Sequence, residues 1–266
     1  MLEIFNYTFM VRAFIAGVTI ALVAPLIGNF LIVRRLSLIA DTLSHVALAG
    51  VAIGLLINLQ PLVATVFVTV LAAIMIEQLR TKQILPAEAI LAIFLPGGLA
   101  VSLILINLAN GFNVNLFSYL FGSLTTVRPE EVGLILLMGI VVVLSVGLLY
   151  RELLYVAFDE ESAQVAGIKV RLINLILIIL TAVTVALSMR IVGILLVGAL
   201  LVIPGVTAMQ WGRGFKQSLF LSLVIALISV VAGLFAAYYL NLPAGAAIVL
   251  VSLALFVITL AARKSY

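Results

Sequence analysis

Residues 11–33, VRAFIAGVTIALVAPLIGNFLIV, decide the class of fold. A transmembrane helix needs about 20 mostly apolar residues to cross a hydrocarbon core about 30 Å thick, and this run is long enough. Comparable runs recur along the chain, which is 66% hydrophobic and 9% charged. Soluble domains carry about 25% charged residues, so this composition excludes a soluble protein. The strict alternation of an outer-membrane barrel is absent, so the sequence predicts an all-α polytopic transmembrane bundle.

Apolar windows between charged residues predict a single transmembrane domain, residues 1–266, with about eight or nine spans. The candidate spans are 11–33, 42–57, 61–79, 88–107, 132–150, 172–189, 191–211, 217–240 and 242–262. The first is too long and too weakly flanked for a cleaved signal peptide, so we expect it to remain in the protein. An arrangement of eight spans with one re-entrant segment is the alternative.

The basic residues predict the orientation of these spans. When the loop 151–171 is placed in the cytoplasm, only Arg12, Arg128 and Arg190 fall away from the cytoplasmic side. The positive-inside rule therefore predicts a cytoplasmic C-terminus and, for nine spans, an external N-terminus. It also accounts for the net charge of +4, which needs no nucleic-acid partner.

Several predicted spans contain residues that interrupt helices or bring them together. Pro25, Pro96 and Pro204 lie inside spans, where a proline removes a backbone donor and is expected to kink or break the helix. The ordinary alternative is that proline is simply more frequent in transmembrane helices. Gly50 and Gly54 form a GxxxG pattern, which predicts close approach of a neighbouring helix.

The stretch from Ser37 to His45, SLIADTLSH, places the only histidine of the chain four residues after Asp41. Residues at this spacing lie on one face of a helix, so the carboxylate and the imidazole point the same way. Ionisable groups at membrane depth are costly and usually face a cavity, a partner or an ion path. Asp41 and His45 are therefore the candidate ion-binding residues.

The loop 151–171 encodes a short helix at about residues 160–166. Asp159 suits the N-cap position, Glu160 and Glu161 suit the positive end of the helix dipole, and Gly167 suits the position after the last turn. Ala163 gives this helix a small apolar side, together with Ala166. A solvated connector is the alternative, but two good caps favour a helix that docks against a soluble partner.

The motifs of several enzyme classes are missing from the sequence. It contains no phosphate-binding loop, no HExxH and no GxSxG, so we expect no ATPase or hydrolase activity and no permanently bound cofactor. With no cysteine, Asp41 and His45 supply only half of a tetrahedral zinc shell. A two-fold homodimer would complete the shell. The alternative is an Asp–His hydrogen bond that stabilises the start of a helix.

These motifs resemble those of one family of transporters. The stretch Arg34 to Gly50 resembles the hallmark segment of the metal-ion (zinc, manganese or iron) ABC transporter permeases. Phe158 to Gly167 resembles their cytoplasmic coupling segment, and Gly193 to Pro204 resembles their later Gly-rich, Pro-broken helix. The more distant cobalamin and iron-siderophore permeases share the last two features but not the Asp–His pair.

The resemblance implies a homodimer of permease subunits in the cell membrane, with an architecture like that of type II ABC importers. It also implies two partners, a cytoplasmic ATP-binding subunit and an extracytoplasmic metal-binding protein. Asp41 and His45 would coordinate the transported metal, and the coupling role would fall on the segment that includes Asp159, Glu160, Glu161, Ala163 and Gly167. The form Asp-Thr-Leu-Ser-His is more similar to the zinc branch than to the manganese branch.

The sequence therefore predicts the membrane subunit of an ATP-driven importer of a divalent transition metal, with zinc as the first candidate and manganese or iron as alternatives. A secondary transporter driven by an ion gradient, with His45 titrating, is the main alternative function. A membrane scaffold without transport activity is a third.

Overall fold

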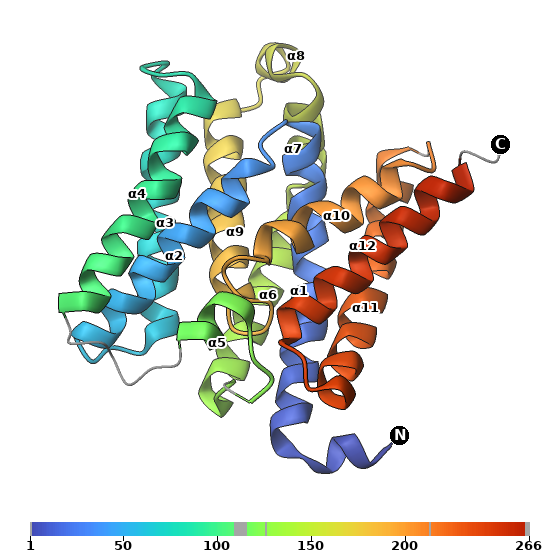
Figure 1. The fold of residues 1–266 in the computed structure, drawn as a ribbon. Helices are drawn as coiled ribbons and strands as arrows, with labels where there is room; N and C mark the ends of the chain where they lie inside the picture. Colours follow the sequence, from blue (N-terminus) through green and yellow to red (C-terminus); the bar gives the residue numbers. More distant parts are fainter. Residues whose placement is uncertain (1, 109–115, 126, 213, 264–266) are drawn as a thin grey trace.

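A computed structural model describes residues 2–108, 116–125, 127–212 and 214–263. These residues form helices joined by short connections, and no strand occurs among them (Figure 1). In chain order the helices are the 3-10 helix η1 (Leu2–Asn6), α1 (Thr8–Val33), α2 (Leu38–Leu56), α3 (Pro61–Thr81), α4 (Ala87–Leu108), α5 (Leu116–Phe121), α6 (Pro129–Leu148), α7 (Tyr150–Phe158), α8 (Glu160–Val165), α9 (Val170–Ser188), α10 (Val197–Met209), α11 (Phe215–Leu240) and α12 (Ala244–Arg263).

Within the described residues, eight helices are long and apolar enough to cross a membrane: α1, α2, α3, α4, α6, α9, α11 and α12. This confirms the predicted all-α membrane bundle. The predicted span 191–211 is wrong as one continuous helix, because only the 13-residue α10 is helical there. The break lies around Gly193, which has a φ of +85°, and not at Pro204, which lies inside α10. Helices α1 and α4 likewise continue through Pro25 and Pro96.

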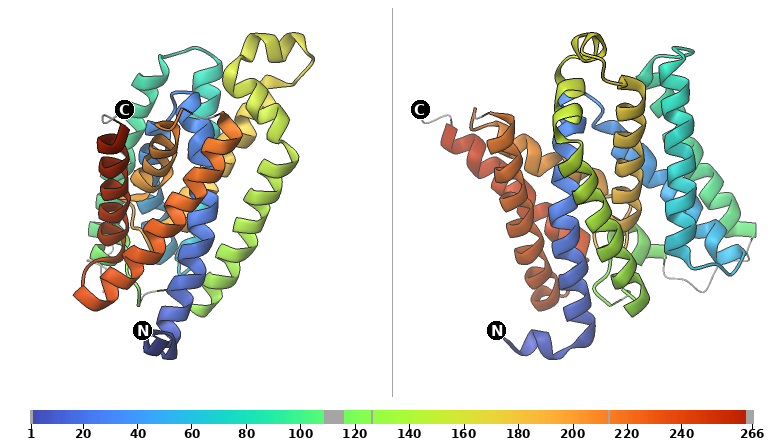
Figure 2. Two further views of the ribbon diagram at one scale, coloured as in Figure 1. Left: turned by 90° about the vertical axis from the view of Figure 1, so that its right-hand side faces the viewer. Right: turned by 180° about the vertical axis from the view of Figure 1, so that it is seen from behind.

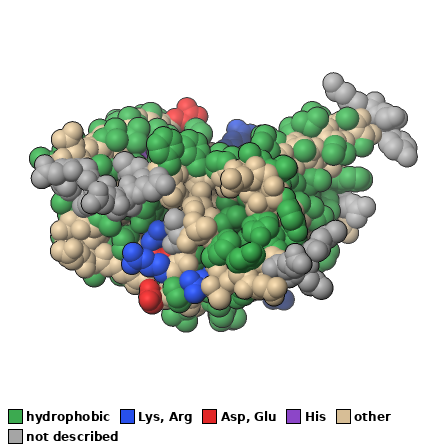
Figure 3. Space-filling view, turned by 60° about the horizontal axis from the view of Figure 1, so that its bottom comes forward, with side chains coloured by type: hydrophobic (Ala, Val, Ile, Leu, Met, Phe, Trp, Pro, Cys, Tyr) green, Lys and Arg blue, Asp and Glu red, His purple; other side chains and the backbone are tan. Residues whose placement is uncertain are grey.

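The two termini lie on opposite sides of the bundle, with the C-terminus on the side of α8 (Figures 1 and 2). The ends of α1 and α3 and the starts of α9 and α11 also lie on the α8 side. These segments and α7 carry most of the described basic residues: Arg34, Arg35, Arg80, Lys82, Arg151, Lys169, Arg171 and Lys216. The charge distribution thus predicts that this side faces the cytoplasm. Viewed with the opposite end brought forward, the surface is mostly apolar with a few charged patches (Figure 3).

Helix α2 is held closely between α3 and α4 by glycines. A Cβ atom on Gly50 would lie 2.7 Å from the Thr65 Cα of α3, so no larger residue fits at this contact. On the other side, a Cβ on Gly98 of α4 would lie 2.9 Å from the backbone nitrogen of Val46. The close approach predicted from the GxxxG pattern is confirmed, with α3 as the neighbour. This packing places α2, which carries Asp41, inside the bundle.

Two segments far apart in the sequence pair at the break before α10. The Ile194 N–H donates to the Tyr119 carbonyl at 2.9 Å, and the Leu195 N–H donates to the Leu120 carbonyl at 3.2 Å. Irregular backbone at membrane depth is tolerated only where its polar groups are satisfied by protein or water. Here the carbonyls of the short helix α5 accept these hydrogen bonds.

Glycines allow the backbones at this break to touch. Gly122 and Gly193 have φ values of +74° and +85°, in the left-handed region that favours glycine. Gly245, at the start of α12, packs so tightly that a Cβ there would overlap the Val192 carbonyl oxygen. The segments around α5, α10 and α12 therefore form one tightly packed junction.

We expect Gly245→Ala to destabilise the folded protein, because the added Cβ meets backbone that cannot rotate away. Overpacking of this kind costs about 1–3 kcal/mol. Gly133→Ala is the matched control, because a Cβ on this exposed glycine of α6 meets nothing within 4 Å. The thermal unfolding midpoint of each variant in detergent is the measurement, and equal midpoints for the two variants would contradict this account of the junction.

Candidate functional site

Asp41 and His45 both lie on α2, in its first two turns. Their spacing puts the two side chains on one face of the helix, and both are partly exposed. Gly198, near the start of α10, lies against Asp41, because a Cβ on this glycine would be 3.5 Å from the Asp41 carboxylate. The structure therefore brings the carboxylate beside the helix that follows the break.

The polar groups of this face differ in how well they are satisfied. The hydroxyls of Thr42 and Ser44 donate to carbonyls of their own helix, at 3.0 and 2.7 Å. The Nδ1 atom of His45 is buried and has no hydrogen-bond partner among the described residues. No hydrogen bond joins Asp41 to His45, both of which the structure describes, so the alternative of an Asp–His hydrogen bond is wrong. A buried nitrogen without a partner needs an explanation, and a ligand that binds there would provide one.

One chain supplies too few ligands for a stable metal site on this face. Among the described residues, no group of three or more His, Cys, Asp or Glu side chains is placed to hold a metal ion. Zinc sites in proteins are commonly tetrahedral, with four ligands. The pair on α2 therefore offers one carboxylate and one imidazole and leaves the remaining positions to other donors.

The predicted short helix of the loop 151–171 is present as α8. The Asp159 side chain accepts a hydrogen bond from the Ser162 backbone N–H at 3.0 Å, and Gly167 follows the helix with a φ of +83°. The hydrogen bonds from the Ser162 side chain and backbone hold the pKa of Asp159 below its ordinary value. Because the folded-state pKa is lowered, the cap stabilises α8 above the unfolded pKa and is lost as the pH falls through the lowered value.

The two sides of α8 have different surroundings. Ala163 is fully buried against the rest of the chain, so its side chain anchors the helix and cannot touch a partner. Val165 is 90% exposed, and Phe158, just before the cap, is also exposed. Glu161 is exposed, and its side chain makes no hydrogen bond or ion pair with another described residue. The outward side of α8 is therefore apolar at its end and acidic at its start.

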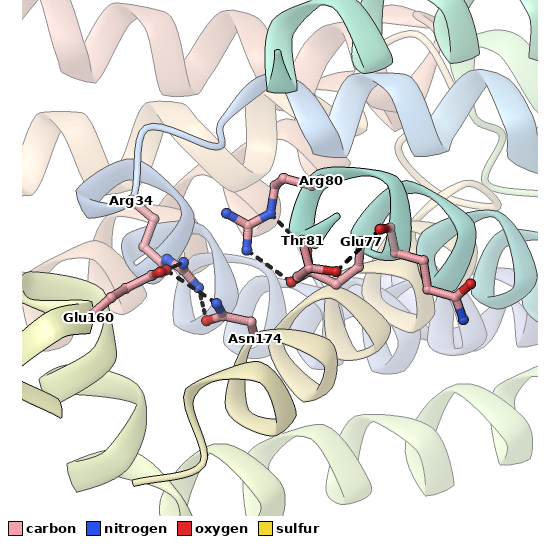
Figure 4. Close-up of polar contacts among 7 residues, drawn as sticks. Arg34, Glu77, Arg80, Thr81, Glu160 and Asn174 are labelled. Carbon is pink, nitrogen blue, oxygen red and sulfur yellow. Dashed lines mark hydrogen bonds and ion pairs between the residues drawn. The ribbon is translucent and has the colours of Figure 1, made fainter. Parts of the chain in front are cut away.

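Glu160, unlike Glu161, is held by other residues of the chain. Its carboxylate accepts hydrogen bonds from the Arg34 guanidinium, which follows α1, and from the Asn174 amide of α9, the latter at 3.2 Å (Figure 4). Arg34 also donates to the Asn174 side-chain oxygen. The sequence singled out Arg34 only as the first residue of the hallmark segment, and it did not single out Asn174. The available signal was a polar amide near the start of an otherwise apolar span.

A fully buried ion pair lies at the end of the bundle opposite α8. Arg190, after α9, pairs with Glu131 in the first turn of α6, and both side chains are buried. The Arg190 guanidinium also lies 4.7 Å from the centre of the Tyr119 ring of α5. The pair accounts for one exception to the positive-inside pattern, because the charge of Arg190 is neutralised inside the protein. That exception was the sequence signal for this contact.

Comparison with known proteins assigns the family. The model of the ABC 3 transport family matches residues 6–263. The chain is 32% identical over 253 residues to the high-affinity zinc uptake system membrane protein ZnuB of Haemophilus influenzae, covering 95% of this chain and 97% of that protein. It is 30% identical over 254 residues to the manganese import system permease protein ScaB of Streptococcus parasanguinis, covering 96% of this chain and 90% of that protein.

A solved structure has the same fold over nearly the whole chain. The structure of PsaBC from Streptococcus pneumoniae in complex with Fab superposes with a TM-score of 0.86 and 30% sequence identity, covering 97% of this chain and 92% of that chain. The motifs, the eight apolar helices and these similarities agree with one another. The chain belongs to the ABC 3 transport family, and its resemblance to the metal-ion ABC permeases is confirmed.

Proposed function

We propose that this chain is the permease subunit of an ABC importer for a divalent transition metal, with zinc as the first candidate and manganese as the second. The observation that carries the proposal is the Asp41–His45 pair on one face of α2, with the Nδ1 atom of His45 unpartnered. The neighbouring hydroxyls are satisfied by the helix itself. The carboxylate and the imidazole are thus the groups on this face that remain available to a cation.

A second copy of the chain would complete the metal site. Each protomer brings the same pair to a two-fold axis, so two copies supply two carboxylates and two imidazoles. A transport site must release its ion as well as bind it, so its affinity has to depend on conformation. A site shared between protomers meets this need, because a small relative movement separates its halves.

The energy for transport would come from a separate cytoplasmic ATP-binding subunit. The chain has no phosphate-binding loop of its own. The exposed Val165 and Phe158 at α8 offer an apolar contact on the side that the positive-inside rule assigns to the cytoplasm. An extracytoplasmic metal-binding protein would deliver the cargo to the other side.

The choice of zinc over manganese rests on residues 41–45 of the hallmark segment, whose form is similar to that of the zinc branch. Carboxylate and imidazole ligands suit both metals, so the ligand types alone do not separate them. Of the two relatives described above, one is named as a zinc uptake protein and the other as a manganese import protein.

Uptake of labelled zinc by cells with and without this chain tests the proposal. We expect uptake that depends on the chain and on its ATP-binding partner, and that excess unlabelled zinc suppresses more strongly than excess manganese does. The reverse order of competition would make manganese the cargo. Equal uptake with and without the chain would refute an importer, and uptake that needs an ion gradient but no ATPase would make the chain a secondary transporter.

A further inference from the structure

The guanidinium of Arg34 joins three parts of the bundle at the α8 end. It donates hydrogen bonds to Glu160 on α8 and to Asn174 on α9, while its own backbone caps the C-terminus of α1 (Figure 4). The contact between Arg34 and Glu160 joins residues 126 positions apart in the sequence. It therefore ties the short helix of the loop directly to the first membrane span.

The two ends of this contact differ in burial. The Arg34 side chain is only 5% exposed, whereas that of Glu160 is 45% exposed. Burial, followed by the nearby charge of Arg80, lowers the pKa of Arg34 to about 10, so the group stays charged at neutral pH. A buried charge that loses its partner is costly. Arg80 does not compete for Glu160, because both of its donated bonds, each 2.9 Å long, go to Glu77.

Because space lies beside α8, the contact between Arg34 and Glu160 is important for holding this helix in position. A cavity of about 510 Å³ opens next to Glu160 and is lined by residues from the end of α3, from α8 and from the start of α9. Arg80, Gln164 and Lys169 are among them. Helix α8 is therefore not packed tightly on this side, and it has room to move when a partner presses on it.

The connection from Arg34 to α2 is short and rigid. The Leu36 N–H donates to the Leu31 carbonyl at 2.8 Å, and Arg35 has a left-handed φ of +56°. This is the hydrogen-bonding pattern of a Schellman turn, which fixes how the chain leaves α1. Helix α2 begins at Leu38, and Asp41 lies in its first turn. A displacement of Arg34 therefore moves the start of α2 and the carboxylate that it carries.

We propose that the Arg34–Glu160 contact is a latch that transmits movement of α8 to the start of α2, and so to Asp41. Arg34 and Glu160 are positioning residues, because they act on the metal path through α2. This inference rests on the proposed function and adds the route between the ATPase and the metal site. The same latch separates the roles of two adjacent carboxylates, since Glu160 faces the latch and Glu161 faces outward.

The test uses the complete importer, with its ATP-binding subunits, reconstituted in vesicles and supplied with zinc. Glu160→Gln keeps the size of the side chain and removes its charge, and Glu130→Gln, at an exposed glutamate of α6 outside the coupling segment, is the control. We expect Glu160→Gln to assemble and hydrolyse ATP as the wild type does, but to move about tenfold less metal per ATP, an effect typical of coupling energies. Glu130→Gln should keep the wild-type ratio.

Exchanging the two charges of the pair protects the test against simple misfolding of a variant. Arg34→Glu and Glu160→Arg should each lower the metal moved per ATP, and the double variant should recover part of it, because the pair is restored with its charges exchanged. A wild-type ratio in Glu160→Gln would overturn the latch. So would loss of assembly in Glu160→Gln, since that result would make Glu160 a docking residue. A wild-type complex that moves no divalent metal would instead refute the proposed function, and the latch with it.

Discussion

Asp41→Ala and His45→Ala are each expected to abolish metal uptake while leaving the protein inserted in the membrane at normal levels. In the proposed site, which two protomers share, each substitution would remove one kind of ligand from both copies and therefore half of the donors. Neither side chain forms a hydrogen bond or ion pair with another described residue, so neither substitution removes a polar contact within the fold. The measurement is zinc uptake in cells that express matched amounts of each variant.

Ser44→Ala is the control for this experiment. Ser44 lies beside His45 on α2, but its hydroxyl donates only to the Asp41 carbonyl of its own helix. We expect uptake by this variant to stay close to that of the wild type. If both the Asp41 and His45 variants transported normally, the metal would have to pass elsewhere and the assignment of these residues would fail.

Glu131→Ala should have the largest effect on stability, lowering the free energy of unfolding by about 3–5 kcal/mol. The substitution leaves Arg190 buried and charged without its carboxylate partner. It also removes the hydrogen bond that the Arg128 backbone N–H donates to Glu131 at 3.0 Å. The thermal unfolding midpoint in detergent, compared with that of the wild type, measures the loss.

Glu130→Ala provides the matched control, because Glu130 is the preceding residue in the same first turn of α6 and is exposed. We expect its unfolding midpoint to stay within the error of the wild-type value. The double variant Glu131→Leu with Arg190→Met should recover much of the stability, since removing both charges leaves none unpaired. A midpoint for Glu131→Ala as high as that of Glu130→Ala would show that the ion pair contributes little.

Local patterns were sufficient to predict the eight long apolar helices of the described residues. Long apolar runs predicted the all-α membrane bundle, since a hydrocarbon core admits few other structures. The caps Asp159 and Gly167 predicted α8 within one residue of its observed end, because both act on the backbone nearest to them. The break in the segment 191–211 was placed at the wrong residue. Pro204 is accommodated inside α10, while Gly193 turns the chain where α5 can satisfy its neighbours.

The candidate site, like the fold, was predicted only in part from the sequence. The i,i+4 spacing of Asp41 and His45 was enough to place both on one face of α2. It could not reveal that Gly198 packs against the carboxylate, or that Nδ1 of His45 is left without a partner. The sequence likewise did not distinguish Glu160 from Glu161. In the structure Glu160 is held by Arg34, whereas Glu161 is exposed and has no such partner.

The sequence by itself determined what depends on neighbours along the chain: which segments are apolar enough to cross a membrane, where α8 begins and ends, and that Asp41 and His45 share one face of α2. Only the tertiary structure decided which distant groups meet, as in the pairs Arg34–Glu160 and Glu131–Arg190. The physical reason is that such contacts depend on how the helices pack against one another, which in this chain is controlled by close contacts at glycines such as Gly50, Gly98 and Gly245. A charged residue in an apolar span can therefore be recognised from the sequence as costly to bury. Its partner is known only once the packing of the helices is known.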